Sequence, residues 1–290
     1  MKITLKQLKV FVAVAKNENM SQAAKIVHLT QSACSMALAI LENQLDGALF
    51  DRHGKQLTLN ERGRILLPKA SNIIAQTEEL QDLMTQDKNK DPAGHLILGA
   101  SSTIGNYLLP SMIGQFVAHH PKVKISLRVA NTEQIIQQLL QFNIDIGMIE
   151  GRCNSNKIKV IPWRKDELVI ISSPKNSLHK KTKITLKDLI AAKWILREIG
   201  SGTRELFEEA MEGQVSPFLE LGHTEAIKQA IRADLGISCL SRAAVADTLK
   251  SGELVELKIP FLKLTRDFYI LLHKEKYQTE ILRAFIKKIS

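Results

Sequence analysis

Apolar residues recur at helical spacing over the first 45 positions and predict three short helices. Thr4 and Gln7 form a capping-box pattern, in which each side chain satisfies an orphan amide at the start of the first helix. Ser21 and Thr30 are good N-cap residues for the second and third helices. The predicted inward face of the first helix carries Leu5, Leu8, Phe11, Val12 and Ala15. The pattern therefore predicts a mainly helical N-terminal unit.

The third predicted helix has two faces of different chemistry. Its core face consists of Cys34, Leu38, Leu41 and Leu45, at helical spacing. Its opposite face consists of Gln31, Ser32, Ser35, Met36 and Ala39. A face made only for solvent would usually carry Lys and Glu, whereas short, polar side chains allow close approach to base edges. A polar face packed on another domain is the alternative. Two short helices joined by a tight turn favour a helix-turn-helix that binds DNA.

A small hairpin, or wing, is predicted over residues 49–59, where two apolar runs flank a polar turn with one glycine. Arg52 and Lys55 at its tip can reach phosphates or the minor groove, although each alone is more often a solvated surface charge. The predicted DNA-contacting residues lie on the second and third helices and on the wing. They are Ser21, Gln22, Thr30, Gln31, Ser32, Ser35, Met36, Arg52 and Lys55.

A long helix is predicted from about residue 60 to residue 86. Its apolar positions alternate spacings of four and three, which is typical of a seam that pairs with a second helix and predicts a dimer. The seam consists of Leu66, Ala70, Ile73, Thr77, Leu80 and Met84. Pro68 is unfavourable inside a helix, so either a kink or the start of the regular helix is expected near it. The polar, turn-rich residues 87–94 predict a domain boundary.

Beyond residue 94, short apolar runs alternate with helical patterns, which is typical of an α/β domain. Strands are predicted at residues 95–100, 123–129, 144–149, 168–172, 194–196 and 237–240. Helices are predicted at residues 107–119, at 132–141, from about 203, and at 225–233. About 200 such residues can form two small lobes around a cleft.

Composition excludes some classes of protein but does not by itself indicate a function. The 290 residues are 44% apolar, and no run approaches the roughly 18 apolar residues of a membrane span. The N-terminal pattern does not resemble a secretory signal, so a cytoplasmic location is expected. Residues 1–65 hold nine Lys/Arg against five Asp/Glu, a net +4 of the total +10, so the DNA prediction rests on pattern and not on charge. The cysteines, Cys34, Cys153 and Cys239, lack metal-ligand spacing and are expected to be buried, with a redox-sensing thiol as the alternative.

The N-terminal sequence resembles the signature of the LysR family of transcription regulators. The resemblance is carried by Ala23-Ala24, Leu29 to Ala33, Leu41-Glu42, Leu49 to Arg52 and Gly63. It implies a winged helix-turn-helix over residues 1–60, a dimerising linker helix over 61–90, and an effector domain over 91–290 with the type 2 periplasmic-binding-protein fold. The lobes implied are residues 91–163 with 266–290, and residues 164–265. Promoter DNA, a homodimer that assembles into a homotetramer, and RNA polymerase are the expected partners.

The recognition helix departs from the family at one position. Met36 stands where the family commonly has Arg, so an Arg–guanine contact is not available there, although the Met side chain can touch a thymine methyl. The departure leaves the operator sequence open.

The effector domain resembles the YeiE/CysL-like branch of the family, whose members are activators associated with sulfite reduction and sulfur assimilation. The similar segments are residues 100–107, 145–151, 194–198, 200–204 and 236–241. The resemblance implies a small-molecule effector and no cofactor or metal. Sulfite is the suggested effector, with sulfate, acetylserine or a carboxylate as alternatives.

Two hydroxyl-rich segments, each at the start of a predicted helix, suggest an anion site between the lobes. Ordinary N-capping is the alternative for each. Glu150 and Glu198 are expected near the cleft, where a carboxylate disfavours an anion unless one of the two carries a proton or an arginine intervenes. The predicted ligand-binding residues are Ser101, Ser102, Thr103, Glu150, Glu198, Ser201, Gly202, Thr203, Arg204 and His223.

Two other classes of protein are weighed against a regulator. An enzyme is disfavoured because the sequence has no GxSxG, HExxH or P-loop pattern, and the segment at 200–204 lacks the P-loop lysine. A stand-alone solute-binding protein is compatible with residues 95–290, but the expected absence of a signal peptide and the N-terminal 90 residues argue against it.

Overall fold

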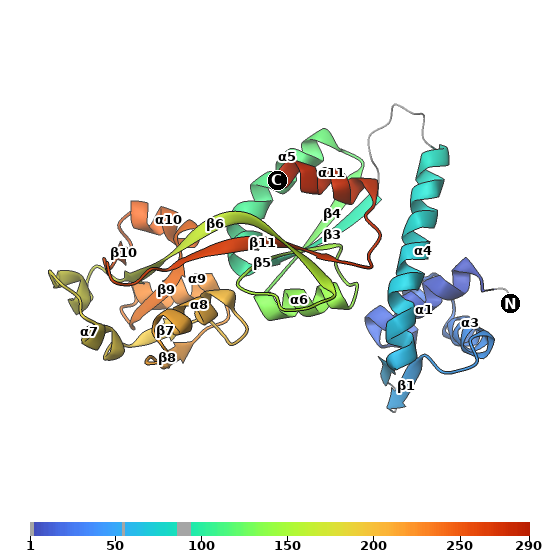
Figure 1. The fold of residues 1–290 in the computed structure, drawn as a ribbon, viewed down its shortest axis with the longest axis horizontal. Coiled ribbons are helices and arrows are strands. Elements are labelled where there is room, and N and C mark those ends of the chain that lie inside the picture. Colours follow the sequence, from blue (N-terminus) through green and yellow to red (C-terminus); the bar gives the residue numbers. More distant parts are fainter. Residues whose placement is uncertain (1–2, 54–55, 86–93) are drawn as a thin grey trace.

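The computed structural model describes residues 3–53, 56–85 and 94–290, without the side chains of residues 52, 53, 56 and 82–85. It has an N-terminal helical unit, a long helix and a mixed α/β domain (Figure 1). Among the described residues, no single helix is long and apolar enough to cross a membrane, and one bent pair, Met20–Ile26 with Gln31–Gln44, passes that test of length and composition together.

The N-terminal unit consists of α1 (Leu5–Asn17), α2 (Met20–Ile26), α3 (Gln31–Gln44) and the antiparallel hairpin of β1 (Phe50–His53) and β2 (Gln56–Leu59). The capping box of Thr4 and Gln7 is confirmed at α1. Thr30 caps α3 as predicted, accepting a hydrogen bond from the amide of Ala33 at 3.2 Å. The N-cap predicted for α2 is wrong, because Asn19 caps that helix and Ser21 lies inside it.

Helix α4 (Glu61–Thr85) runs through Pro68, which removes the hydrogen bond that the Arg64 carbonyl would otherwise accept. The predicted seam is divided in the structure. Ala70 is fully buried and packs, like Leu66, against the N-terminal core, whereas Ile73 and Leu80 are exposed. The side chain of Met84 lies outside the described residues. The N-terminal part of the seam therefore stabilises this chain itself. Over the part of α4 whose side chains are described, the exposed large apolar residues are Ile65, Ile73 and Leu80.

The α/β domain is built on a nine-stranded sheet in the order β4-β3-β5-β11-β6-β9-β7-β8, with β10 paired to β6. The strands are β3 (Gly94–Ser101), β4 (Val123–Ala130), β5 (Ile146–Glu150), β6 (Ile158–Ser172), β7 (Trp194–Leu196), β8 (Pro217–Glu220), β9 (Ile237–Ser241), β10 (Val255–Glu256) and β11 (Thr265–His273). The helices are η1 (Ile104–Leu108), α5 (Leu109–His119), α6 (Thr132–Leu140), η2 (Ser177–Lys180), α7 (Leu186–Ile190), α8 (Gly202–Ala210), α9 (Thr224–Arg232), α10 (Arg242–Lys250) and α11 (Glu280–Ile289). The helix predicted at 107–119 begins earlier, as the π-helix η1.

Two long antiparallel strands, β6 and β11, connect the halves of this domain (Figure 1). β11 pairs with β5 in the first half, while residues 168–172 of β6 pair with β9 in the second half. Each half has its own apolar clusters, among them one around Phe116 and Phe285 and another around Trp194 and Phe207. The chain therefore crosses between two separately packed halves, and the crossing point can act as a hinge.

Phe142 joins the α/β domain to the N-terminal unit. Its ring is buried within the N-terminal apolar cluster and lies 4.3 Å from the ring of His273, which is 4% exposed. Asn72 of α4 strengthens this junction by accepting a hydrogen bond from the Tyr277 amide at 2.8 Å. The N-terminal unit and the α/β domain are thus in direct contact within one chain.

This junction should weaken in acid. Burial lowers the pKa of His273 below its ordinary value of 6.5, Lys157 and Lys276 act in the same direction, and Glu275 opposes them. Because the unfolded imidazole binds its proton at higher pH than the folded one, stability is lost as the pH falls through 6.5. We expect a lower melting temperature at pH 5.5 than at pH 7.5. His273→Phe, which keeps the stacked ring, should reduce this difference, and an unchanged difference in calorimetry would contradict the assignment.

Candidate functional site

Helices α2 and α3 have helix-turn-helix geometry. Their axes differ by 99°, within the roughly 90–120° of that motif. His28 takes the left-handed conformation, with φ of 54°, in the turn between them. Ser21 donates a hydrogen bond to the side-chain oxygen of Gln31 at 3.1 Å and so ties α2 to the start of α3. The turn and this contact fix the angle at which α3 is presented.

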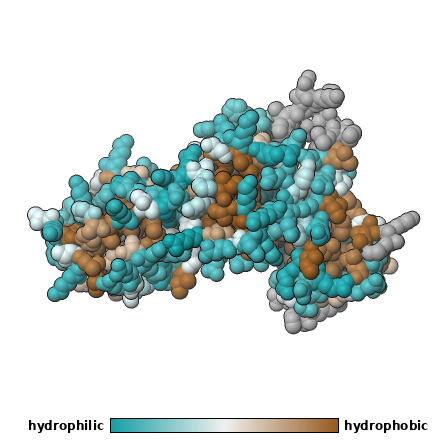
Figure 2. Space-filling view, in the orientation of Figure 1, coloured by the Kyte–Doolittle hydropathy of each residue, from teal (hydrophilic) through white to brown (hydrophobic). Residues whose placement is uncertain are grey.

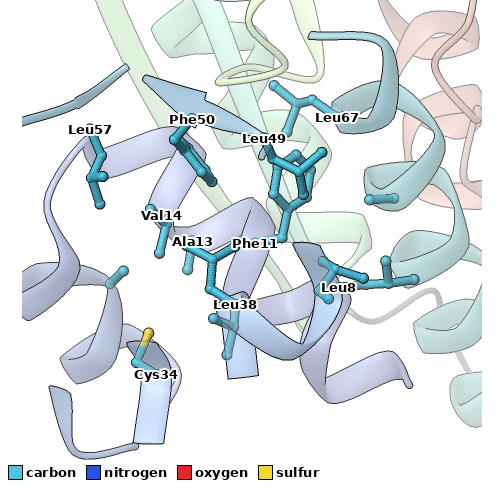
Figure 3. Packing of buried hydrophobic residues seen from close by; sticks show 14 of the residues in the cluster. Leu8, Phe11, Ala13, Val14, Cys34, Leu38, Leu49, Phe50, Leu57 and Leu67 are labelled. Atoms are coloured by element: carbon cyan, nitrogen blue, oxygen red, sulfur yellow. The ribbon is translucent and has the colours of Figure 1, made fainter. Parts of the chain in front are cut away.

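The apolar cluster of the N-terminal unit orients α3 (Figure 3). Cys34, Leu38 and Leu41 point into this cluster and are at most 1% exposed. The 3.6-residue period of the helix then places the polar residues on the opposite side. The predicted DNA-contacting residues on α2 and α3 are all exposed: Ser21, Gln22, Thr30, Gln31, Ser32, Ser35 and Met36. Lys55 lies outside the described residues, and Arg52 is placed by its backbone in β1 alone.

A second site is formed where the two halves of the α/β domain meet. Ser101, Ser102 and Thr103 lie at the end of β3 and before η1, while Ser201, the N-cap of α8, and Thr203, in its first turn, come from the other half. The halves touch at Gly202, where an added Cβ would lie 2.0 Å from the Glu150 carbonyl oxygen. Only glycine allows the start of α8 to approach β5 so closely.

Arg266 lies at the centre of this site and is 9% exposed. Its guanidinium bonds to Glu150 at 2.8 Å and to Asp166 at 2.7 Å, both of them buried carboxylates. It also donates to the hydroxyl of Thr203 at 3.0 Å and to that of Thr103 at 3.5 Å. Arg266 therefore joins the first half, the crossing strand β6 and the second half in one hydrogen-bonded network.

Arg197 makes a second contact between the halves. It is 3% exposed and follows β7, and it donates to the Ser102 hydroxyl at 3.1 Å. The Glu198 carboxylate accepts two further hydrogen bonds from the same guanidinium, at 2.7 and 2.8 Å. Glu198 is thereby placed at the edge of the site by the residue that precedes it.

Two buried hydroxyls at this site have no hydrogen-bond partner within the described part of the chain. They belong to Ser101 and Ser201, which are 0% and 3% exposed. N-capping does not account for them, because Ser201 makes no side-chain capping bond and the N-cap of η1 is Thr103, again without one. A buried polar group without a partner costs about 1–3 kcal/mol. Hydroxyls held in this way are suited to a ligand that supplies the missing bonds.

Arg204, predicted to add charge to the ligand site, already has partners within the protein. Its guanidinium bonds to Glu208 at 2.7 Å, to Glu220 and to the carbonyl of Arg197. The last of these contacts holds the backbone carbonyl of Arg197. Among the described residues, Arg197 and Arg266 are the buried arginines that bond across the two halves. His223 is exposed at the N-cap of α9 and makes no capping bond.

Sequence reasoning missed Arg266, Asp166 and Tyr107. Arg266 lies on the same buried face of β11 as Phe268 and Ile270, in alternation with the exposed Thr265 and Asp267, on a strand that the sequence analysis did not predict. That alternation was a usable signal, because a cation at a buried position of a strand requires a partner.

Two of the three cysteines are suited to packing. Cys34 and Cys239 are buried, and burial raises the pKa of the Cys239 thiol to about 12. Such a thiol is poorly reactive, because the thiolate is the nucleophile. Cys153 is half-buried and free.

Known proteins share this organisation. Residues 5–64 match the family described as bacterial regulatory helix-turn-helix protein, lysR family, and residues 89–289 match the LysR substrate binding domain. The uncharacterized HTH-type transcriptional regulator YeiE of Escherichia coli is 43% identical over 289 residues, covering 99% of this chain and 97% of that protein. The HTH-type transcriptional regulator CysL of Bacillus subtilis is 27% identical, covering 95% and 98%.

A full-length OxyR variant from Pseudomonas aeruginosa has the same fold, with a TM-score of 0.76 at 20% identity and coverage of 99% of this chain and 98% of that chain. Both family matches fall on the units described above, and together they span nearly the whole chain. The chain therefore belongs to the LysR family of ligand-responsive, DNA-binding transcription regulators.

Proposed function

We propose that this regulator senses a small oxyanion in the site between the two halves of its effector domain, and that sulfite is the anion. The unpartnered hydroxyls of Ser101 and Ser201 carry the proposal. They come from different halves, and the residue after each of them, Ser102 or Gly202, lies in contact with the other half. The chain is similar to YeiE and CysL over nearly its whole length. A role in sulfur metabolism is suggested by the branch that the effector-domain sequence resembles. The family and these relatives are transcriptional regulators and not enzymes.

The charges at the site favour an anion that carries a proton. Two arginines, Arg197 and Arg266, face the three carboxylates of Glu150, Asp166 and Glu198, which gives a net charge of −1 when all are ionised. A dianion would be repelled, whereas a protonated monoanion such as bisulfite can donate its proton to a carboxylate and accept bonds from the serine hydroxyls.

Calorimetry of the full chain separates the possible ligands. Sulfite should bind, and Ser101→Ala and Ser201→Ala should each weaken it by about 5-fold or more, because each removes one hydrogen bond. Sulfate, thiosulfate, acetylserine and a simple carboxylate serve as competitors. If one of these compounds binds and sulfite does not, the proposed ligand is wrong and that compound takes its place. Unchanged affinity in both serine variants would contradict the proposed site.

The proposed assembly uses the exposed apolar residues of α4. Ile65, Ile73 and Leu80 are 45–59% exposed, and brown patches lie in the region of α1 and α4 on the right of Figure 2. We propose that a second copy covers them in a homodimer, and that dimers pair into a homotetramer on promoter DNA, where RNA polymerase is recruited. The proposed lobes, which enclose the ligand between them, are residues 91–163 with 266–290 and residues 164–265.

Removing the polar face of α3 should separate DNA binding from ligand binding. In Gln31→Ala/Ser35→Ala, the specific affinity for promoter DNA should fall by about 10- to 100-fold, since a good base contact contributes about 1–3 kcal/mol. Binding of sulfite should not change. Fluorescence anisotropy with labelled promoter DNA measures the effect, and Asn43→Ala, an exposed residue near the end of the same helix, is the control. Equal affinities in the two variants would contradict the proposed DNA-binding face.

A further inference from the structure

A polar contact joins the two halves of the effector domain beside the serine-lined site. The hydroxyl of Tyr107, from η1 in the first half, donates a hydrogen bond to Glu225 Oε1 at 2.6 Å. Glu225 lies in the first turn of α9, in the second half. Burial raises the pKa of Tyr107 and the bond to Glu225 acts in the same direction, so the phenol remains the donor.

Lys228 holds the acceptor of this bond in place. Its ammonium group lies 2.7 Å from the same Glu225 oxygen, 3.3 Å from the carbonyl oxygen of Ala244 and 5.6 Å from the centre of the Tyr107 ring. Lys228 is 7% exposed, whereas the Glu225 side chain is 61% exposed. The buried lysine therefore fixes a carboxylate at the surface, and that carboxylate holds the tyrosine of the other half.

The position of Tyr107 follows from the chain around it. Residues 101–103, which carry hydroxyls of the effector site, lead directly into η1. η1 is a π-helix, a form that often marks functional positions. Arg197 lies close enough to act electrostatically on the Tyr107 phenol, and Glu198 lies near Gly222, which precedes the N-cap of α9. The Tyr107–Glu225 contact thus borders the region that contains the effector hydroxyls.

We infer that Tyr107 and Glu225 are positioning residues that hold the two halves closed over the effector site and set how fast the effector enters and leaves. The identity of the effector rests on the proposed function. The inference that Tyr107 and Glu225 hold the halves closed does not rest on the identity of the effector, because both residues of this contact belong to the protein. Loss of one such hydrogen bond should shift the equilibrium between the closed and open arrangements of the halves by about 2- to 10-fold.

Distance measurements on the ligand-free full chain test the closure directly. Spin labels at Gln115→Cys in α5 and Gln229→Cys in α9, both exposed positions, report the separation of the halves in a Cys153→Ser background. Tyr107→Phe and Glu225→Gln should lengthen and broaden the distance distribution. Tyr277→Phe is the matched control, because it also removes a tyrosine–glutamate hydrogen bond, to Glu79, but away from this site. Distributions identical to the wild type in both variants would overturn the inference.

Stopped-flow binding with sulfite as the probe tests the consequence. Because the contact closes both the free and the occupied site, its loss should raise the association and dissociation rate constants together, by about 2- to 10-fold, and leave Kd nearly unchanged. A Kd that changes through the dissociation rate alone would identify a ligand contact and overturn the inference. If sulfite fails to bind the wild-type chain, the proposed ligand is wrong, and the distance measurements still decide the closure.

Discussion

Replacing Arg266 by Met should lower the melting temperature of the effector domain by about 6–20 °C. The substitution leaves the buried carboxylates of Glu150 and Asp166 without their shared cation. Breaking a buried ion pair from one side costs about 3–5 kcal/mol, and 1 kcal/mol moves the midpoint of a domain of 150–250 residues by about 2–4 °C. Scanning calorimetry of the full chain measures the transition of the effector domain.

Two further variants show whether the unpaired charges cause this loss. Arg164→Met removes an exposed arginine of β6 that lies over the Trp163 ring and should have a small effect. Adding Glu150→Gln and Asp166→Asn to Arg266→Met should recover part of the stability, because the buried charges are then removed. A shift below about 2 °C in the single variant would mean that Arg266 does not hold the halves together.

Phe11→Ala should abolish DNA binding while the effector domain stays folded. Phe11 is 0% exposed, and its ring lies 5.7 Å from that of Phe50, which attaches the wing to α1. Truncation of a buried Phe costs about 3–5 kcal/mol. The free energy of unfolding of a unit of about 60 residues is roughly 3–9 kcal/mol in total, at the stability per residue that is typical of proteins. The affinity for promoter DNA should therefore fall by about 100-fold or more.

Ile3→Ala is the comparison for Phe11→Ala, because Ile3 is 39% exposed in the same unit. It should leave DNA binding within about 2-fold of the wild type, as expected of a surface substitution. Circular dichroism during heating should show an early transition in Phe11→Ala alone. A Phe11→Ala variant that binds promoter DNA normally would contradict the role of this core.

The N-terminal unit could be predicted from the sequence because its signals are local. The capping box at Thr4, the N-cap at Thr30 and the inward stripe of α3 each depend on residues within a few positions of one another. The N-cap predicted for α2 was wrong because Asn and Ser are both good N-cap residues. The choice depends on which side chain the Gln22 amide reaches, and in the structure that is Asn19.

The effector site could be predicted only in part, because it depends on contacts between distant positions. The hydroxyl segments were found from their place before helices. The arginine that joins them is 163 residues from Thr103 and 63 residues from Thr203, on a strand that the sequence did not reveal. Arg204 stood in the expected motif and carried the expected charge, but Glu208 and Glu220 bind it.

The packing offers a path from the proposed effector site to the DNA-binding unit. The halves are joined by Arg266 and meet at a hinge of two strands, and the first half contacts the DNA-binding unit through Phe142. A ligand changes this arrangement only if its affinity differs between the two states of the protein. An anion that binds one relative arrangement of the two halves more tightly than another would favour that arrangement and, through the Phe142 junction, change the geometry of the dimer on DNA.

Footprinting of promoter DNA by the full chain, with and without sulfite, tests the central claim most directly. The account predicts that sulfite changes the length or the hypersensitive positions of the footprint in the wild type. It predicts a reduced response in Ser101→Ala/Ser201→Ala, with basal DNA binding intact. A footprint that sulfite does not alter, or one that it alters equally in the double variant, would contradict an oxyanion sensor built on these two hydroxyls.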